Sequence, residues 1–157
     1  MTLFLINILL AAGFMIALES LTLAALVSGF AVGYAVLWLT QPLYDDTRYF
    51  TRVPNVIRLG VFFMKALIVS NLRVLWDVLT PGQINRPGII RVPLDARTDL
   101  EIMMVANLIS LTPGTLSIDL SADRQSLYVH VMFLEDIETA RQEIKDGLER
   151  RILEVLR

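Results

Sequence analysis

The chain has 157 residues, 55% of them hydrophobic, and a mean hydropathy of +0.59, which is the composition of a small integral membrane protein. Its net charge of −2 leaves no basic surface large enough to neutralise a run of phosphates, so no nucleic-acid partner is expected. The absence of cysteine excludes disulfides and thiolate metal sites, and a single histidine, His130, argues against His-rich metal sites and most catalytic triads. We therefore expect no enzyme activity, no cofactor and no bound metal.

Residues 1–44 carry one charged side chain, Glu19, and no lysine or arginine precedes Arg48. A cleaved signal peptide would begin with basic residues and lead into a polar chain, whereas here a second apolar run follows the first. One helix over Leu3–Leu39 would be about 55 Å long, well beyond the roughly 30 Å hydrocarbon core. We therefore expect two transmembrane helices, near Leu3–Leu18 and Leu23–Leu39.

The polar tetrapeptide Glu19-Ser-Leu-Thr22 marks the turn between these spans. Its position favours a solvated turn carboxylate for Glu19 over an intramembrane proton or cation ligand. In the second span, Gly29 and Gly33 have the GxxxG spacing that allows close helix packing, so we assign them to a packing surface. Basic residues follow the second span closely, which predicts that both termini are cytoplasmic.

Residues 45–79 are predicted to form a basic loop and then a third helix over Pro54–Leu79, with Pro54 in its first turn. Arg58, Lys65 and Arg73 fall within a sector about 80° wide. This pattern favours an amphipathic helix lying on the inner leaflet, with its basic side toward the headgroups and cytosol. The alternative is a short third span whose cations reach the interface, which would put the carboxy-terminal domain on the other side of the membrane.

Residues 80–157 have the charge density of a soluble domain, and their pattern predicts a cytoplasmic α+β domain of order βαββα. Ile89–Leu94 reads as a strand, and Thr98-x-x-Glu101 as a capping box that opens a helix ending near Leu111. Alternation then predicts a hairpin over residues 116–133, with its turn at residues 122–125. A last helix capped by Asp136 carries one apolar stripe, composed of Ile137, Ala140, Ile144, Leu148, Ile152 and Val155.

The helix over residues 99–111 is apolar around nearly its whole circumference. A domain of this size cannot bury such a helix completely, so part of it is expected to meet a partner subunit or the membrane. We include Met103 and Met104 in this predicted packing surface.

No catalytic group is evident in the chain. Asp119 is a candidate cross-strand neighbour of His130, but a partly exposed structural histidine is the stronger interpretation. The serines and threonines of residues 110–121 lack the context of a nucleophile elbow, and no P-loop lysine is present.

The segment Ala106-Asn-Leu-Ile-Ser-Leu-Thr-Pro-Gly-Thr115 resembles the signature of the E-type subunit of the Mrp-type multisubunit cation/proton antiporters, also called Mnh or Pha. Further blocks agree in order and spacing: Lys65 with Ser70-Asn71, Arg86-Pro-Gly-Ile89, Thr98-Asp-x-Glu101 and Leu127-Tyr-Val-His130. The likeness spans nearly the whole chain, although the amino-terminal spans agree only in hydropathy.

The resemblance implies an accessory subunit of a bacterial inner-membrane complex that exchanges sodium or potassium for protons. It implies other antiporter subunits and membrane lipid as partners, and Na⁺ and H⁺ are not expected to bind this chain directly. No catalytic residue is carried over; the motif positions Asn107, Thr112, Pro113, Gly114 and Thr115 are expected to shape a turn and a docking surface. The alternative is a self-contained membrane-anchored regulator whose cytoplasmic domain binds a ligand or a protein. An anchored hydrolase that uses His130 ranks last.

Overall fold

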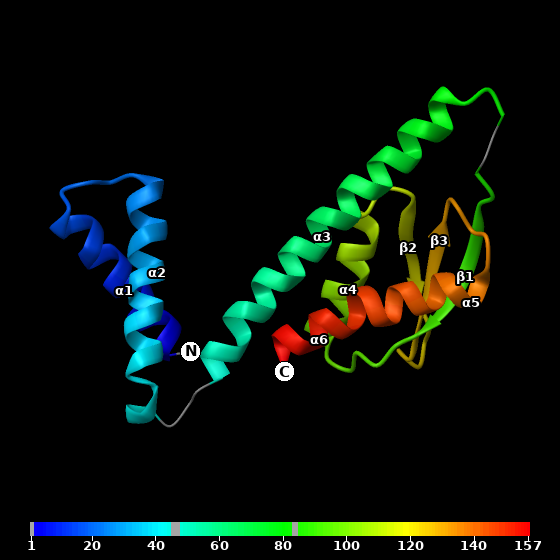
Figure 1. Cartoon of the computed structure of the whole chain (residues 1–157). Helices are drawn as coiled ribbons and strands as arrows, with labels where there is room; N and C mark the ends of the chain where they lie inside the picture. Colours follow the sequence, from blue (N-terminus) through cyan, green and yellow to red (C-terminus); the bar gives the residue numbers. More distant parts are fainter. Residues whose placement is uncertain (1, 45–47, 83–84) are drawn as a thin grey trace. The chain divides into compact units, whose positions relative to one another are not determined.

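The structure, a computed structural model, describes residues 2–44, 48–82 and 85–157 (Figure 1). The chain divides into two compact units, Met1–Pro54 and Asn55–Arg157. Each unit has its own hydrophobic core.

The first unit contains the predicted helix pair, α1 (Thr2–Ala17) and α2 (Leu23–Leu39). Between them the chain reverses at Glu19, whose φ of 50° lies in the left-handed region, and the Thr22 side chain caps α2 by accepting a hydrogen bond from the Ala25 amide. The buried residues of α2 follow a four-residue spacing that faces α1: Ala25, Gly29, Gly33 and Leu37. The prediction of two helices joined at Glu19 is therefore correct.

A short 3-10 turn, η1 (Gln41–Leu43), follows α2, and the long helix α3 extends over Arg48–Leu79. The predicted start at Pro54 is wrong, because residues 48–53 are helical rather than a loop; residues 45–47 of the predicted loop lie outside the described residues. Proline has no amide proton to donate to Phe50, four residues earlier. That carbonyl instead accepts a hydrogen bond from the Tyr34 hydroxyl, at 3.3 Å, so the helix continues through Pro54 with the carbonyl satisfied.

Helix α3 is the one helix in the described ranges that is both long and apolar enough to cross a membrane by length and composition. Helices α1 and α2 are shorter and more uniformly apolar. Helix α3 is instead amphipathic, and from Asn55 onward it is part of the second unit. One of its sides contributes Leu59 to the core of that unit, and Phe62 and Phe63 pack against the same core.

The second unit contains a three-stranded antiparallel sheet of order β1-β3-β2, which confirms an α+β domain. Its strands are β1 (Gly88–Pro93), β2 (Thr115–Leu120) and β3 (Ser126–Val131), and α4 (Asp99–Leu111) connects the first two. The predicted capping box opens α4, with both the Thr98 and Glu101 side chains bonded to backbone amides. The domain core contains alternate strand residues: Ile90, Val92, Leu127, Val129 and Val131.

Helices cover one face of this sheet, and the other face is open. Strand β2 places its polar side against the helices, because the Ser117 hydroxyl donates to the Ala106 carbonyl of α4 at 2.9 Å. The apolar side chains of Leu116 and Ile118 on this strand are about half exposed. Leu116 and Ile89 are both cross-strand partners of His130, one on each side of it. A bulge between Ser117 and Asp119 shifts the register of the hairpin.

The chain ends in a helix of three consecutive parts: α5 (Ile137–Gln142), the π-helical segment η2 (Glu143–Glu149) and α6 (Arg150–Leu156). The predicted Asp136 cap is present. The apolar stripe is spaced 3, 4, 4, 4 and 3 residues, and successive four-residue steps drift around a helix of 3.6 residues per turn. A π turn, bonded from i to i+5, takes more residues per turn and corrects that drift, so both Leu148 and Ile152 remain in the core.

Candidate functional site

The Thr112–Thr115 segment ends α4 and starts β2. Gly114 has a φ of 88°, a conformation that glycine adopts without strain, and its carbonyl accepts the Met132 amide at 2.8 Å. The Thr115 hydroxyl lies 2.6 Å from the Ile109 carbonyl, and the Thr112 hydroxyl bonds to the Leu108 carbonyl. The polar groups of this motif therefore satisfy the end of the helix.

The same four residues line a cavity of about 660 Å³ in the second unit. Its other walls come from one side of α3, the end of β3 and the π-helical segment η2. The Arg151 guanidinium lies 4.1 Å from the centre of the Phe62 ring, and a Cβ on Gly147 would be 3.2 Å from that ring. Phe62 of α3 thus contacts Arg151 of the last helical part and leaves little space beside Gly147 of η2, and the Thr112–Thr115 segment lines the same cavity.

Helix α4 presents a partly apolar surface outward. Met103 is 53% exposed and Asn107 is exposed, on the same side as Leu100 and Leu111, and we define these four residues as the α4 stripe. Met104 is instead half-buried and packs against the core. The structure therefore separates the predicted packing residues into an exposed pair, Met103 and Asn107, and a set that contacts the interior of the domain.

A buried carboxylate holds the start of α4. Glu101 is 5% exposed and accepts the Arg97 and Thr98 amides at 2.8 and 3.1 Å and the Arg157 side chain at 2.9 Å. The Arg157 side chain, with the two amides, lowers the pKa of Glu101 from its usual 4.5 to about 2. The last helix is therefore fastened to the first turn of α4 by a charged pair.

A second buried carboxylate, Glu149, comes from η2. One of its oxygens accepts the Asp95 and Ala96 amides at 2.6 and 2.9 Å, and the other has no hydrogen-bond partner among the described residues. Nothing in the sequence pattern identifies Glu149 as buried, because it sits among the charged residues of an otherwise ordinary amphipathic helix.

In the first unit, the two glycines of the predicted packing surface lie against α1. A Cβ on Gly29 would be 3.0 Å from the Ala11 carbonyl oxygen and from the Phe14 Cβ, and one on Gly33 would overlap the Asn7 side chain. Packing of Gly29 and Gly33 against another subunit stays a prediction.

Asn7 is fully buried and was missed by the sequence reasoning. Its amide donates to the Tyr49 hydroxyl at 2.6 Å, which connects α1 to the first turn of α3. The available signal was that Asn7 is a polar side chain within an apolar span, a position that usually faces a protein partner.

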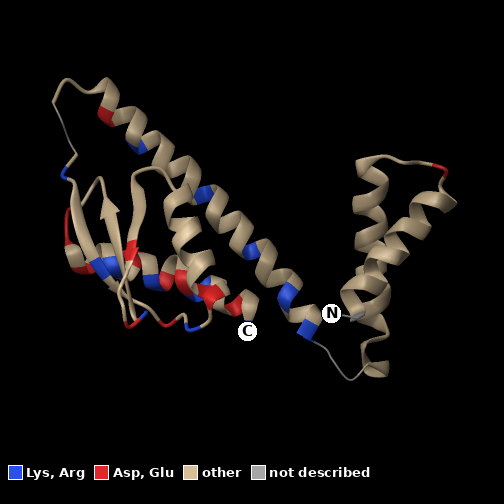
Figure 2. Cartoon of the chain, turned by 180° about the vertical axis from the view of Figure 1, so that it is seen from behind, with Lys and Arg blue, Asp and Glu red and all other residues tan. Residues whose placement is uncertain are grey.

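Charged residues are absent from α1 and α2 and frequent from α3 onward (Figure 2). The predicted pairing of Asp119 with His130 is wrong, because Asp119 lies opposite Tyr128 and His130 lies between Ile89 and Leu116. Within the described ranges, no group of three or more His, Cys, Asp or Glu is placed to hold a metal ion. The geometry that remains is a set of packing surfaces.

Comparison with known proteins gives matches over most of the chain. Residues 7–155 match the sequence model of the family described as Na⁺/H⁺ ion antiporter subunit. The chain is 38% identical over 137 residues to the E-type Na⁺/H⁺ antiporter subunit of Alkalihalophilus pseudofirmus, covering 87% of each protein. It is 36% identical over 153 residues to the E-type subunit of Bacillus subtilis, covering 98% of this chain and 97% of that protein.

Two solved structures resemble the fold. A chain of the Mrp complex from Dietzia sp. DQ12-45-1b aligns with a TM-score of 0.52 and 27% identity, covering 65% of this chain and 96% of that chain. A chain of the membrane-bound sulfane sulfur reductase, an archaeal respiratory membrane complex, aligns with a TM-score of 0.57 over 96% of both chains. Its identity of 24% indicates a shared fold only.

Proposed function

Because this chain belongs to the family of E-type Na⁺/H⁺ antiporter subunits, which are parts of transporters rather than enzymes, we propose that it is an accessory subunit without an ion relay of its own. In this role it supports assembly and transport by docking to subunits that carry the ions.

The observation that carries this proposal is the composition of the helix pair. Helices α1 and α2 contain no acidic or basic residue. The buried Asn7 side chain donates its amide to the Tyr49 hydroxyl, and its oxygen has no hydrogen-bond partner among the described residues. Transport of protons and cations through a membrane requires ionisable or oxygen-rich relays facing a wet path. Helix packing is the property that this pair offers.

The proposed topology has two spans and cytoplasmic termini. Three arginines follow α2 closely and none precedes it, which is the charge bias of a cytoplasmic segment. The chain has no native cysteine, so a single cysteine placed at Gln125, in the exposed hairpin turn, reports the side of the domain. We expect a membrane-impermeant thiol reagent to label it in opened membranes but not in intact cells; labelling in intact cells would refute the topology.

Helix α3 is proposed to lie along the inner leaflet. Its contacts with the domain extend from Leu59, in the core, to Arg73, whose guanidinium lies 5.8 Å from the centre of the Phe133 ring. A helix that crossed the bilayer in this packed state would carry a charged domain into hydrocarbon. The opposite side of α3 is apolar and exposed, with Val61, Met64 and Ile68 more than half exposed, and it is suited to insertion at an interface.

The α4 stripe is proposed to dock on another subunit of the antiporter. We expect Met103→Lys to weaken co-purification of this chain with the large polytopic subunits from gently solubilised membranes, because a charge in an apolar contact is left without solvent. Gln125→Lys, on the exposed hairpin turn, is the matched control and is expected to leave co-purification unchanged.

The same preparation tests the accessory role itself. Wild-type protein that migrates alone, without any large polytopic subunit, would contradict the proposed function and favour the self-contained anchored regulator. Reading frames for large antiporter subunits beside this one would be independent support.

A further inference from the structure

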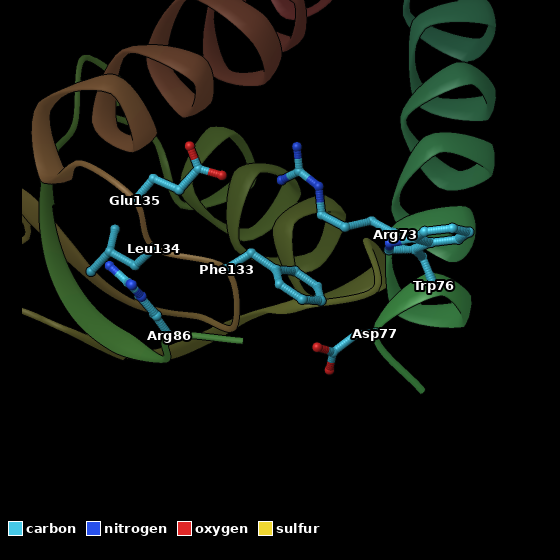
Figure 3. A pocket seen from close by; sticks show the side chains of 7 residues that line it. All are labelled: Arg73, Trp76, Asp77, Arg86, Phe133, Leu134 and Glu135. Atoms are coloured by element: carbon cyan, nitrogen blue, oxygen red, sulfur yellow. The ribbon is translucent and has the colours of Figure 1, made fainter. Parts of the chain in front are cut away.

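A second cavity, of about 520 Å³, lies at the carboxy-terminal end of α3 (Figure 3). Its walls come from three places in the chain: Arg73, Trp76 and Asp77 on α3, Arg86 before β1, and residues 133–135 after β3. The last two walls are joined, because the Leu134 amide donates to the Arg86 carbonyl at 3.0 Å and Arg86 forms a bridge with Phe133.

Four charged side chains line the cavity. Within the described part of the chain, Arg73, Arg86 and Glu135 form no ion pair. The fourth charged group, Asp77, is engaged, accepting the backbone and side-chain nitrogens of Asn85 at 3.1 and 3.3 Å. Figure 3 shows the Arg73 and Glu135 side chains extending toward one another across the cavity. Two guanidinium groups and one carboxylate therefore lack an ionic partner among the described residues, and the Arg73 guanidinium lies over the Phe133 ring at 5.8 Å from its centre.

The cavity opens beside an exposed apolar surface. Trp76, which lines the cavity, is 67% exposed, and Leu75, Val78 and Leu79 in the same last turns of α3 are also more than half exposed. Tryptophan is the side chain most typical of the headgroup level of a bilayer, where its ring meets both apolar and polar surroundings. If α3 lies on the inner leaflet, as proposed above, the mouth of the cavity is at headgroup depth.

We propose that this cavity binds the headgroup of an ethanolamine phospholipid. Arg73 and Arg86 bond to the phosphate, since guanidinium groups suit bidentate phosphate recognition. Glu135 accepts the ammonium group, and the acyl chains lie along Leu75, Val78 and Leu79. The carboxylate selects this zwitterionic lipid over an anionic lipid such as phosphatidylglycerol, which has no ammonium group to offer Glu135.

The test is native mass spectrometry of the full-length protein in detergent, titrated with phosphatidylethanolamine, phosphatidylglycerol or phosphatidylcholine. We expect phosphatidylethanolamine to bind most tightly. Arg73→Gln and Arg86→Gln should each weaken it about fivefold, the effect of one basic side chain near a lipid phosphate. Glu135→Gln should remove the preference over phosphatidylglycerol. Arg58→Gln, an exposed arginine of α3 outside the cavity, is the control and should have no effect.

Equal binding of the three lipids, or binding that these substitutions leave unchanged, would overturn the proposal. Soluble phosphoethanolamine binding as tightly as the lipid would also overturn it, because the ligand would then be a free metabolite.

The placement of α3 is measured separately, with a nitroxide on a cysteine at Ile68 in lipid nanodiscs, where oxygen accessibility reports immersion. If the label is immersed in the bilayer but the protein shows no lipid preference in the titration, the headgroup site alone is rejected. A label in water rejects the interfacial placement on which the site rests.

Discussion

Replacing Glu101 by glutamine tests whether a buried charge, rather than a hydrogen bond of any kind, holds α4 to the last helix. The variant keeps the shape of the side chain. Its single carbonyl oxygen can retain the Arg97 and Thr98 amides, but its NH₂ group then faces Arg157, where a carboxylate oxygen lay 2.9 Å from Nε. The variant loses an ion pair whose Arg157 side chain is 53% exposed, and it weakens two charge-assisted bonds to buried backbone amides. We expect the unfolding free energy of the second unit to fall by about 1–3 kcal/mol, because solvent screens the exposed partner.

Asp99→Asn is the matched control, because it also removes an acid from the first turn of α4. The Asp99 side chain is 86% exposed and its partner Arg124 is half exposed, so this surface pair is expected to contribute about 0–1 kcal/mol. The measurement is denaturant unfolding of the full-length protein in detergent, and the unfolding is monitored by hydrogen exchange of peptides that cover α4.

The pH dependence separates charge from shape. The folded pKa of Glu101 is about 2, below the usual 4.5, so the unfolded chain takes up the proton first as the pH falls. The stabilisation is complete above pH 4.5 and is lost toward about pH 2. The gap between wild type and Glu101→Gln should therefore be constant near neutrality and narrow in acid. The reasoning would be refuted if the difference in unfolding free energy between wild type and Glu101→Gln stayed constant down to about pH 2. It would also be refuted if Glu101→Gln and Asp99→Asn lowered the unfolding free energy equally.

Three other substitutions probe backbone and helix packing. Gly29→Ala should weaken the α1–α2 contact by about 1–3 kcal/mol, because the added Cβ meets backbone atoms of α1. Gly13→Ala is the control, since its added Cβ meets nothing within 4 Å. The efficiency with which an engineered disulfide forms between the two helices reports the difference. Gly114→Ala should cost about 1–2 kcal/mol through its positive φ, with Gly82→Ala as a neutral comparison in thermal unfolding. Tyr49→Phe should lower the stability of the first unit by about 1 kcal/mol, and an unchanged thermal midpoint would show that its bond to α1 is dispensable.

Local signals in the sequence were sufficient for most elements of the second unit. The pattern Thr98-x-x-Glu101 places the start of α4, and the end of that helix follows from Pro113 and Gly114. Both signals act over one or two turns of chain, so the rest of the protein has little influence on them.

The errors came from interactions between distant residues. Pro54 is favoured at a helix start, but the Tyr34 hydroxyl supplies a donor for the carbonyl that proline leaves unpaired, and nothing local announces this. The expected pairing of Asp119 with His130 failed because the hairpin has another register: Leu116, three residues before Asp119, lies opposite His130. The bulge after Ser117 puts Asp119 opposite Tyr128, and no turn signal in the sequence fixes either feature.

The candidate packing residues were predicted in part. The tight turn at Gly114 was expected, and the exposure of Met103 and Asn107 fits the expectation that α4 is not buried on all sides. Helices on one face of the sheet were expected, but the exposure of Ile89, Leu116 and Ile118 on the other face was not. Alternation shows which residues share a side of a strand but not which side the helices cover.

The π-helical segment makes the last helix tolerant of a change in length. Deleting one residue normally rotates everything beyond it by about 100° and turns an apolar stripe away from its core. Here the stripe spacing of 3, 4, 4, 4 and 3 would become 3, 4, 3, 4 and 3 if the exposed Asp146 were removed, which is the stripe of a regular α-helix. Ile152 would still point into the core, and Arg157 would still point toward Glu101. Homologues one residue shorter between Ile144 and Leu148 would thus share the same packing, and a one-residue gap there in an alignment would mark a change in helix winding rather than in fold.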